Sequence, residues 1–511
     1  MRGVAAAILG IALTGAASGR KMDDGGAEIA APSKFKTDNA TGGNSVSGSS
    51  LPGDGDTPWW HIFHDAALEK LEHDAITTNQ DLRQSVARVV EARAQARVAA
   101  ADFFPAVTAP LRAARQRTTN TGPIVGSRLA GNASSAAALG GAGATGSTAF
   151  EAQELSASYN DFQAGLSLSY EVDVFGHIRH TYGQAAANAR AAAADRQAVQ
   201  LSLTSQVAAS YFALRALDSE VAILQRTRHL RGDAAQIQKE RVKAGTANDM
   251  DLSRAELEQA NTEADLCDAM QRRAESENAL AVLCGQPASD FHIEPKPLEP
   301  NRPPAVPATV PAQLLTQRPD MIEARHRLMA SNEGIGAARA RFLPTFAIAA
   351  NYGYESAEFG QLLEDQSHTW SITGGVSIPI FEGGRNAANL KAARAERDGA
   401  VAAYRQTALT AFEEAENALS ALRQRALQAE ARGRATESAS RVFDAAQKSY
   451  QEGAIDYFEV IDAQRALLSA EVSKVQTVNA RYAATIDLIR AMGGCYGDAD
   501  EQAAGPSAGL R

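Results

Sequence analysis

The chain has 511 residues, a formal net charge of −10 and only 6% aromatic residues. The negative charge and the lack of a lysine/arginine cluster argue against nucleic-acid binding. Alanine-rich stretches and the low aromatic content favour long, thin helices over one thick globular core.

The amino-terminal region indicates a secretory signal followed by a linker. Arg2 precedes the apolar run 4–13, which is too short to span a bilayer, and small residues follow at 16–19. We therefore predict a signal peptide over 1–19 and a flexible linker over 20–57, rich in Gly, Ser and Asp. Because no cysteine precedes Cys267, we expect ordinary signal cleavage without a lipid anchor.

A helix and a weak strand come next in the chain. Asp65 is the expected N-cap of a helix that extends to about Ala101, and Phe103-Phe104-Pro105 ends it. Alternation from Val107 to Ala113 predicts a strand, and the aperiodic stretch 116–160 predicts a long loop.

The segment from Phe162 to Gly285 predicts a strand that leads into a long helical hairpin. Apolar and polar residues alternate strictly from Phe162 to Val174, which is typical of a strand with one apolar face. Apolar residues then recur every three or four positions, which is helical. A break is expected at Ala244-Gly245-Thr246, after which a second helix returns to Leu283.

A proline-rich connector, residues 286–312, separates this segment from the rest and should be extended. Arg318-Pro319-Asp320 then starts a helix to about Arg341, and a third strand is predicted over 346–354. The same plan follows again, with an alternating strand over 370–380 and a long helical stretch broken at Glu452-Gly453-Ala454.

The two halves of the chain agree closely in spacing. Phe175 lies 70 positions before Gly245, and Phe381 lies 72 before Gly453. From each of these glycines, the next glycine that ends a helix lies 40 positions on, at Gly285 and Gly493. This agreement indicates an internal duplication, with repeats over 58–285 and 313–494 and a disordered tail over 495–511.

The predicted fold class is an α+β membrane protein. Four strands of about 9–13 residues can cross a bilayer, but the smallest single-chain barrels have about eight strands. Since open sheet edges are not tolerated in lipid, several chains must share one barrel, and three chains would give twelve strands. About sixty helical positions over 183–243 give roughly 90 Å of coiled-coil helix. The alternative is a soluble coiled-coil interaction protein with an ordinary sheet.

The chain resembles the TolC-like outer membrane factors, specifically the NodT-type channel subunits of resistance-nodulation-division (RND) efflux systems. The resemblance covers about residues 57–494. It rests on an ordered set of short motifs: Trp59-Trp60 with Phe63 and Asp65, Asn79 with Asp81-Leu82, Arg318-Pro319-Asp320, Ile335-Gly336 with Ala338, Phe342-Leu343-Pro344, and Phe381-Glu382-Gly383-Gly384-Arg385. The family implies a homotrimer with a twelve-stranded barrel in the outer membrane and an α-helical periplasmic tunnel. It also implies docking to a periplasmic adaptor and an inner-membrane pump.

Candidate functional residues lie at the two helix breaks. Gly245 and Gly453 should mark the hairpin tips, where the family closes its channel and meets its adaptor. Glu459 and Asp462 are three positions apart and share a helix face, so three chains would give two acidic rings that favour cations. By resemblance they match the acidic constriction of the family, although Ile455 stands where some members carry a basic residue. Solvated helix residues are the plain alternative.

By resemblance, Tyr450 and Asp251 match a pair that holds the closed tip by a hydrogen bond. The alternative is that they are unrelated surface residues.

Other motifs predict no chemistry. Cys267, Cys284 and Cys495 are expected to be small apolar packing residues, and the 17-residue spacing of the first two on one helix prevents their pairing. His177-Ile178-Arg179-His180 lacks a third ligand, so it indicates interfacial polar residues rather than a metal site. We expect no enzyme activity and no cofactor.

The function indicated is passive export of drugs or other small toxic compounds through the outer membrane of a Gram-negative cell. Metal-ion efflux or type I protein secretion through the same kind of duct remain alternatives.

Overall fold

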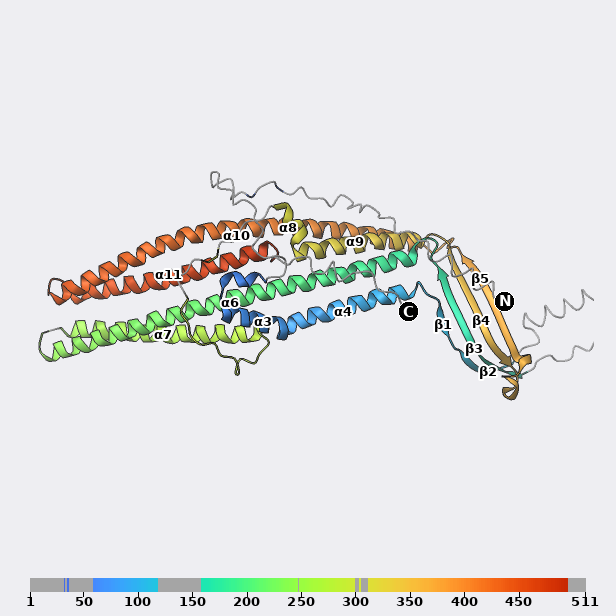
Figure 1. Ribbon diagram of the computed structural model, residues 1–511, viewed down its shortest axis with the longest axis horizontal. Coiled ribbons are helices and arrows are strands. Elements are labelled where there is room, and N and C mark those ends of the chain that lie inside the picture. The colour runs from blue at the N-terminus through green and yellow to red at the C-terminus, as the bar shows by residue number, and fades with distance from the viewer. Residues whose placement is uncertain are drawn as a thin grey trace, which may run out of the picture. The chain divides into compact units, whose positions relative to one another are not determined.

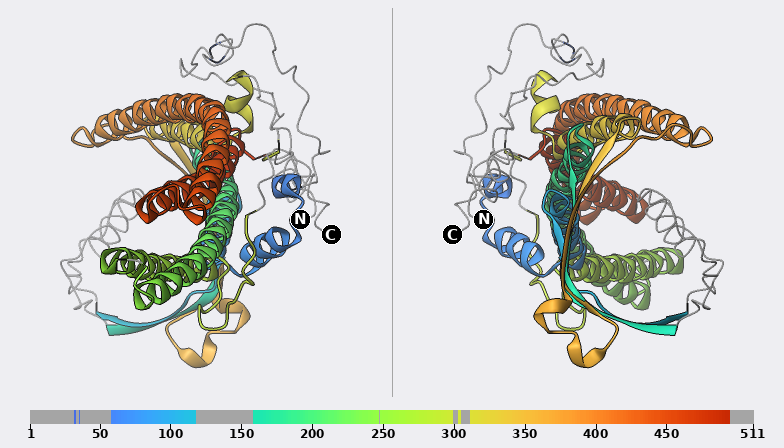
Figure 2. Two further views of the ribbon diagram at one scale, coloured as in Figure 1. Left: turned by 90° about the vertical axis from the view of Figure 1, so that its left-hand side faces the viewer. Right: turned by 90° about the vertical axis from the view of Figure 1, so that its right-hand side faces the viewer.

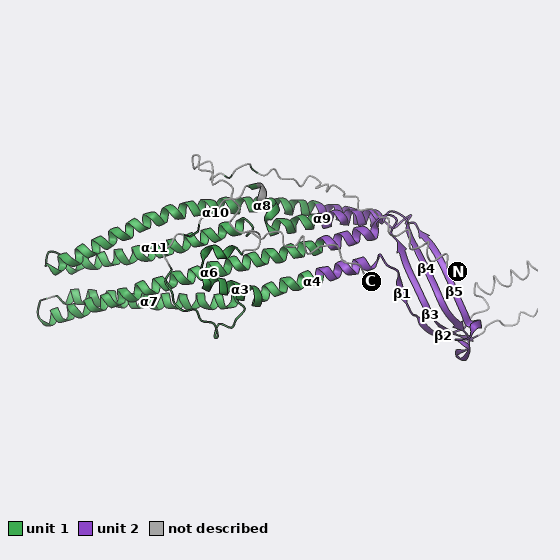
Figure 3. Cartoon of the chain, viewed as in Figure 1, with its two compact units in different colours: residues 1–91, 188–328, 398–511 green, residues 92–187, 329–397 purple. Residues whose placement is uncertain are grey.

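The computed structural model describes residues 32, 35, 58–117, 158–246, 248–298, 303–304 and 311–494. Figure 3 shows two compact units. Unit 1 comprises Met1–Glu91, Asn188–Leu328 and Asp398–Arg511, and unit 2 comprises Ala92–Ala187 and Met329–Arg397. Each unit combines segments from both halves of the chain, so the units are not the two sequence repeats.

Figure 1 labels the secondary structure, in which long helices predominate. The helices are η1 (Trp59–Phe63), α3 (Ala66–Thr78), α4 (Gln80–Ala101), α6 (His177–Lys243), α7 (Asp249–Leu283), α8 (Pro311–Gln317), α9 (Pro319–Ala340), η2 (Phe359–Gln361), η3 (Asp365–Ser367), α10 (Arg385–Gln451) and α11 (Tyr457–Ala491). The strands are β1 (Ala106–Thr108), β2 (Leu111–Arg117), β3 (Ser158–Val172), β4 (Thr345–Ser356) and β5 (His368–Ser377).

The two helical hairpins have equal lengths. Helices α6 and α10 each contain 67 residues, and α7 and α11 each contain 35. Both hairpins belong largely to unit 1, where the α6–α7 pair lies beside the α10–α11 pair (Figure 2). The sequence predicted both hairpins and both breaks.

The sheet of unit 2 is antiparallel throughout, in the order β1-β3-β4-β5. Its central pair joins the two halves of the chain, since β3 residues from Phe162 to Val172 pair with β4 residues from Ser356 to Phe346. Strands β1 and β2 both pair with β3, so they occupy one edge, and β5 occupies the other. Figure 2 shows the sheet as curved.

The strand predicted over Val107–Ala113 is present but interrupted. β1 ends at Thr108 and β2 begins at Leu111. Between them, Pro110 has no backbone N–H to contribute to a ladder, and its carbonyl accepts a 3.4 Å hydrogen bond from Gly165. The four predicted strands are therefore five segments in the structure.

The prediction of one continuous helix from Asp65 to Ala101 is wrong, because the helix is interrupted between Thr78 and Gln80. Asp65 caps α3 as expected, with its carboxylate accepting from the backbone N–H of Ala67 at 2.9 Å. Asn79, however, adopts an extended conformation and separates α3 from α4. Its side-chain oxygen accepts from the N–H of Leu82 at 2.9 Å, and its side-chain nitrogen donates to the carbonyl of Leu283 at 2.9 Å. Asn79 therefore caps one helix while binding the end of another.

The largest core of unit 1 is rich in aromatic residues and joins η1, α3, α4, α6, α7 and α11. Phe212 of α6 and Tyr482 of α11 stack with ring centroids 4.3 Å apart, and Phe63 lies 4.9 Å from Phe212. Tyr211 is 1% exposed and donates a 2.7 Å hydrogen bond to Asp65. Residues of η1, α3 and α7 complete this core: Trp59, Trp60, Leu68, Leu71, Ala75, Leu280 and Cys284.

The cysteines differ in their surroundings. Cys284 is buried in this core as expected, and burial raises the pKa of its thiol to about 12. The expectation for Cys267 is wrong, because it lies exposed on α7. Cys495 lies outside the described residues.

None of the helices in the described part of the chain is both long and apolar enough to cross a membrane.

Candidate functional site

Both hairpin tips are helix C-caps built on glycine. Gly245 has φ +72° and Gly453 has φ +77°, a left-handed conformation that costs glycine little. Thr246 donates its N–H to the carbonyl of Arg241, and Ala454 donates to that of Ser449, each at 2.8 Å. These are the bonds of a Schellman motif, so both long helices end in the same way. The structure confirms the two predicted reversals of the chain.

The four helices that approach the tips share a small core. Tyr457, Val460 and Ile461 of α11 are buried against Ala235 of α6 and Ala255 of α7. Phe443 and Tyr450 of α10 pack against the same cluster. Burial raises the pKa of Tyr457 to about 12. The two hairpins are therefore packed together at this end of unit 1.

Glu459 and Asp462 lie on the solvent side of this core. Both side chains are exposed in the single chain, whereas Val460 and Ile461 between them are buried. The predicted common face therefore exists, and it is available for a neighbouring molecule or a water-filled space.

Tyr450 binds α6 in the structure. Its hydroxyl accepts a hydrogen bond from the side chain of Gln238 at 2.7 Å and another from Arg241. The guanidinium of Arg241 also lies 5.3 Å from the centre of the Tyr450 ring. Asp251 instead lies 3.6 Å from Arg254. Among the described residues, Tyr450 and Asp251 form no hydrogen bond with each other.

A buried ionic cluster near the tip was not predicted from the sequence. The carboxylate of Glu258 on α7 lies 3.0 Å from Arg231 of α6, and their side chains are 5% and 4% exposed. Arg465 of α11 donates to the other oxygen of Glu258 at 3.0 Å. Arg231 also donates to the hydroxyl of Thr262 at 2.7 Å. Burial lowers the pKa of Arg231, and the charge of Glu258 opposes this effect. One carboxylate thus connects three helices.

A groove with a volume of about 500 Å³ runs beside this cluster. Its walls come from α6, α7 and α11 and combine charged and apolar side chains, including Glu220, Leu224, Arg272, Arg465, Leu468 and Val472.

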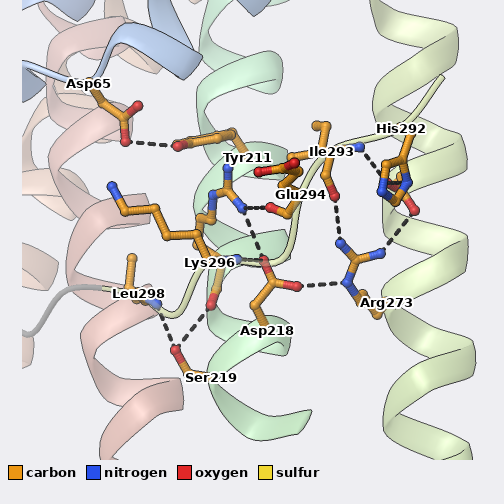
Figure 4. Close-up of polar contacts among 12 residues, drawn as sticks. Asp65, Tyr211, Asp218, Ser219, Arg273, His292, Ile293, Glu294, Lys296 and Leu298 are labelled. Atoms are coloured by element: carbon orange, nitrogen blue, oxygen red, sulfur yellow. Dashed lines mark hydrogen bonds and ion pairs between the residues drawn. The ribbon is translucent and has the colours of Figure 1, made fainter. Parts of the chain in front are cut away.

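A second polar network holds the connector after α7 (Figure 4). Asp218 of α6 is 1% exposed and lies 3.1 Å from Arg215 and 2.6 Å from Arg273. Arg273 of α7 also lies 2.9 Å from Glu277. These charged groups are largely buried and paired with one another, which is the condition for tolerating them in a core.

The connector supplies its backbone to this network. Arg215 donates to the carbonyl of Glu294 at 2.6 Å, and Arg273 donates to that of Ile293 at 2.9 Å. Asp218 accepts from the N–H of Lys296 at 3.0 Å, and the hydroxyl of Ser219 accepts from that of Leu298 at 2.7 Å. Residues 293–298 are thus extended along α6 and α7, as predicted for this part of the connector.

The histidine motif of unit 2 forms ordinary polar contacts. His180 lies 2.6 Å from Glu333 of α9, and Arg179 donates to Asp173 at 3.0 Å. Within the described ranges, no three His, Cys, Asp or Glu side chains are arranged to hold a metal ion.

Two long helical hairpins of equal length, with acidic side chains beyond one tip, and a separate antiparallel sheet together define the TolC-like outer membrane channel fold. The comparisons with known proteins agree. The chain is 32% identical over 444 residues to outer membrane protein OprJ of Pseudomonas aeruginosa, covering 85% of this chain and 86% of that protein. It is 30% identical over 437 residues to the cation efflux system protein CusC of Escherichia coli, covering 85% and 88%.

Among solved structures, the outer-membrane channel OprN matches with a TM-score of 0.77 and 26% identity, covering 92% of this chain and 97% of that one. The model of the outer membrane efflux protein family matches residues 71–286 and 310–494. The chain belongs to this family, which confirms the resemblance inferred from the sequence motifs. It is an outer-membrane component of an efflux system, as predicted.

Proposed function

We propose that this chain is one subunit of a homotrimeric exit duct that passively conducts drugs or other small toxic compounds to the cell exterior. Its relatives support the substrate class, since they include a solvent efflux pump outer membrane protein of Pseudomonas putida. No catalytic chemistry is needed for this role, because the transport energy would come from a partner pump.

The observation that supports the trimer is a sheet with two edges that have no partner strand within the described residues. β1 and β2 form one edge and β5 the other, and apolar side chains are exposed on the sheet, including Leu166, Trp370 and Ile372. Unpaired backbone groups in lipid cost several kcal/mol each, so the edges must meet other strands. Counting β1 and β2 as one strand, three chains supply twelve strands, enough for a closed barrel.

An internal duplication accounts for the equal helix lengths in the two halves. We assign the repeats to 58–285 and 313–494, separated by the connector 286–312. In the trimer the helical hairpins would form a periplasmic tunnel below the barrel. A periplasmic adaptor would dock at the tips around Gly245 and Gly453, with an inner-membrane pump of the RND type behind it.

The barrel is tested by cross-linking strand edges between chains. Single cysteines at Arg112 in β2 and Thr369 in β5, in a background with the native cysteines replaced by serine, cover the two edges. Mixing the two single variants should give covalent dimers, and a variant with both cysteines should give covalent trimers, in outer-membrane fractions. The control is a single cysteine on α4, for example Val98→Cys, in the same background. A monomer at every edge position would contradict the shared barrel.

The tip is proposed as the closed gate. Glu459 and Asp462 would form two acidic rings, and Asp251 and Tyr450 would contribute to holding the tip shut. In support, Glu459 and Asp462 are exposed on one face of α11, and Tyr450 is already hydrogen-bonded to α6.

Replacing Glu459 and Asp462 together with alanine should raise the single-channel conductance in planar bilayers, because the constriction loses its charged side chains. The control is Glu452→Ala, which removes an exposed carboxylate at the same tip. Unchanged conductance in the double variant would refute the constriction.

A cation is the second candidate for the cargo. It is supported by the relative CusC, named as a cation efflux system protein, and by the acidic pair at the tip. A strain that lacks the chain should then become sensitive to a metal salt rather than to solvents or drugs. The relatives named above give no comparable support for protein secretion, and membership of the outer membrane efflux protein family excludes the soluble coiled-coil alternative.

A further inference from the structure

The sheet of unit 2 has one apolar face and one polar face. Partners in an antiparallel ladder project from the same face, so the register places Leu166, Tyr352 and Trp370 side by side on the apolar face. The alternate residues project from the polar face. In the proposed barrel the apolar face meets lipid and the polar face lines the duct.

One end of the sheet has no helix attached to it. Helices α4, α6, α9 and α10 all join the strands at the opposite end, through short connections (Figure 3). At the end without helices, Arg117 of β2 pairs with Ser158 of β3, and Tyr354 of β4 pairs with His368 of β5. Because the helices are periplasmic in the proposed duct, this is the outer end of the sheet.

Aromatic side chains gather on the apolar face near the outer end. The ring of His368 lies 4.8 Å from that of Tyr352 and 5.8 Å from that of Tyr354, measured between centroids. Phe359 of η2 extends the group, since its ring lies 5.5 Å from that of Phe162. An aromatic girdle of this kind marks the level of the lipid headgroups on an outer-membrane barrel.

Two arginines continue the apolar face at the outer end of β2. Ala113 pairs with Phe162 and therefore lies on the apolar face. With a period of two, Arg115 and Arg117 follow on the same face, about 7 Å apart along the strand. Both are exposed. Arg112, on the same strand, projects from the polar face with its partner Gln163.

The carboxylates of the sheet lie on the other face. Within the five described strands they are Asp161, Glu171 and Glu355, and their ladder partners place all three on the polar face. The apolar face at the outer end therefore carries two positive charges from the strands and no negative one. A guanidinium binds phosphate oxygens through paired N–H donors, and basic residues beside a bilayer attract anionic lipids.

We propose that Arg115 and Arg117 form a binding site for the phosphate groups of an anionic lipid in the outer leaflet. The aromatic girdle next to them contacts the upper part of its acyl chains. In the outer membrane of a Gram-negative cell, the lipid with this chemistry is lipid A, a phosphorylated glycolipid. This inference rests on the shared barrel of the proposed function, which sets the apolar face against lipid, and it is independent of the cargo.

Native mass spectrometry of the full-length trimer in detergent tests the site, with lipid A that carries both of its phosphates as the probe. The double variant Arg115→Gln/Arg117→Gln should bind this lipid about tenfold to thirtyfold more weakly than the wild type, because two charge contacts are lost. Arg112→Gln is the matched control on the polar face and should bind as the wild type does. Lipid A without phosphates should bind the wild type and the double variant equally weakly.

The outcomes separate this inference from the proposed barrel. Equal affinity of the wild type and the double variant for phosphorylated lipid A, with both proteins trimeric, would overturn the inference and leave the duct intact. Loss of the trimer in the double variant alone would assign the arginines to contacts between subunits and would also overturn it. Displacement of the lipid by an equal concentration of inorganic phosphate would show a plain anion site instead. A wild type that is not trimeric would refute the shared barrel, and the lipid-facing site with it.

Discussion

Helices α6 and α10 have the same length and end in the same glycine cap, yet they are covered in different ways. Helix α6 buries Leu203, Val207 and Tyr211 beneath α3, η1 and the connector. Helix α10 buries only alanines among its described residues, and Leu409 and Leu427 are 56% and 55% exposed. Helices of the same length therefore differ in burial: α6 contributes large side chains to a core, and α10 leaves apolar side chains exposed in the single chain.

The ionic cluster shows the same difference. Arg231 and Glu258 of the first hairpin are buried and paired, whereas the residues 208 positions later are Ala439 and Ala466. The buried ion pair is thus a feature of the first hairpin, whereas in the second hairpin α11 is well buried and α10 is not. Equal spacing thus gives the two hairpins the same path, whereas their side chains give them different cores.

The largest effect is expected from Glu258→Ala. The substitution leaves Arg231 buried without its charge partner, which should lower the free energy of unfolding by about 3–5 kcal/mol. Glu240→Ala, which breaks an exposed pair with Lys243, should cost less than about 1 kcal/mol. Denaturant midpoints of the two variants measure the contrast. Equal midpoints would contradict the buried role of Glu258.

A matched pair of leucines compares the two helices directly. Leu214 of α6 is fully buried, and Leu422, 208 positions later on α10, is partly buried. Leu214→Ala should cost about 2–5 kcal/mol, the range for a buried leucine, and Leu422→Ala clearly less. Thermal unfolding in detergent checks this. A cost for Leu422→Ala as large as for Leu214→Ala would show that a neighbouring chain completes the cover of α10.

Helix α3, which packs on α6, carries a buried carboxyl group that destabilises the fold when it is ionised. Glu72 of α3 is 0% exposed, neither carboxylate oxygen has a hydrogen-bond partner within the described structure, and burial raises its pKa to about 9. The folded state therefore retains a proton that the unfolded state loses above its ordinary pKa of 4.5. Stability due to this group is greatest below that value. It should fall by about 1.4 kcal/mol per pH unit up to pH 9 and then level off.

Glu72→Gln should remove this slope. The variant should be more stable than the wild type by about 3 kcal/mol at pH 7 and equally stable at pH 4, because only the ionisation penalty is lost. The control is Glu69→Gln, on the exposed side of α3. A slope that persists in Glu72→Gln would assign the pH dependence to another group.

The smallest effect is expected where α3 meets α4. Asn79→Ala removes the cap of α4 and the bond to Leu283, at a cost of about 1–2 kcal/mol. Asn79→Asp keeps the cap oxygen but not the donor to Leu283, so it should lose less. Helix content and the unfolding midpoint measure both variants. Equal losses for the two variants would show that the bond to Leu283, rather than the cap, accounts for the effect.

The parts of the fold that the sequence predicts are those with a local cause. Strict alternation marks β3, and the glycines with positive φ mark both tips. The break at Asn79 also has a local signal, since Thr77-Thr78-Asn79 is a poor helix sequence, but the apolar period continues across it. The spacing of apolar residues alone therefore predicts one helix. The side-chain cap at Asn79 divides it into α3 and α4.

The parts that the sequence does not predict depend on contacts between distant segments. Glu258 meets Arg231 and Arg465 only because α6, α7 and α11 pack with these three side chains facing one another. Asp218 and Arg273 resemble ordinary surface charges until the connector lies over them. Phe35 stands in a Gly- and Ser-rich stretch where no periodicity exists to show that it is buried. The acidic face of Glu459 and Asp462 follows from local spacing, whereas the Tyr450 contacts to α6 do not.

The pairing of β3 with β4 also sets the order of events during biogenesis. Partners in this ladder, such as Phe162 with Ser356 and Val172 with Phe346, are 194 and 174 positions apart. At about 5–20 residues per second, ribosomes need roughly 10–40 s to make the intervening chain. Throughout this interval β3 is a strand without its central neighbour, able to bind any other exposed strand. The newly made chain is therefore open to wrong strand pairing for as long as its second half is missing.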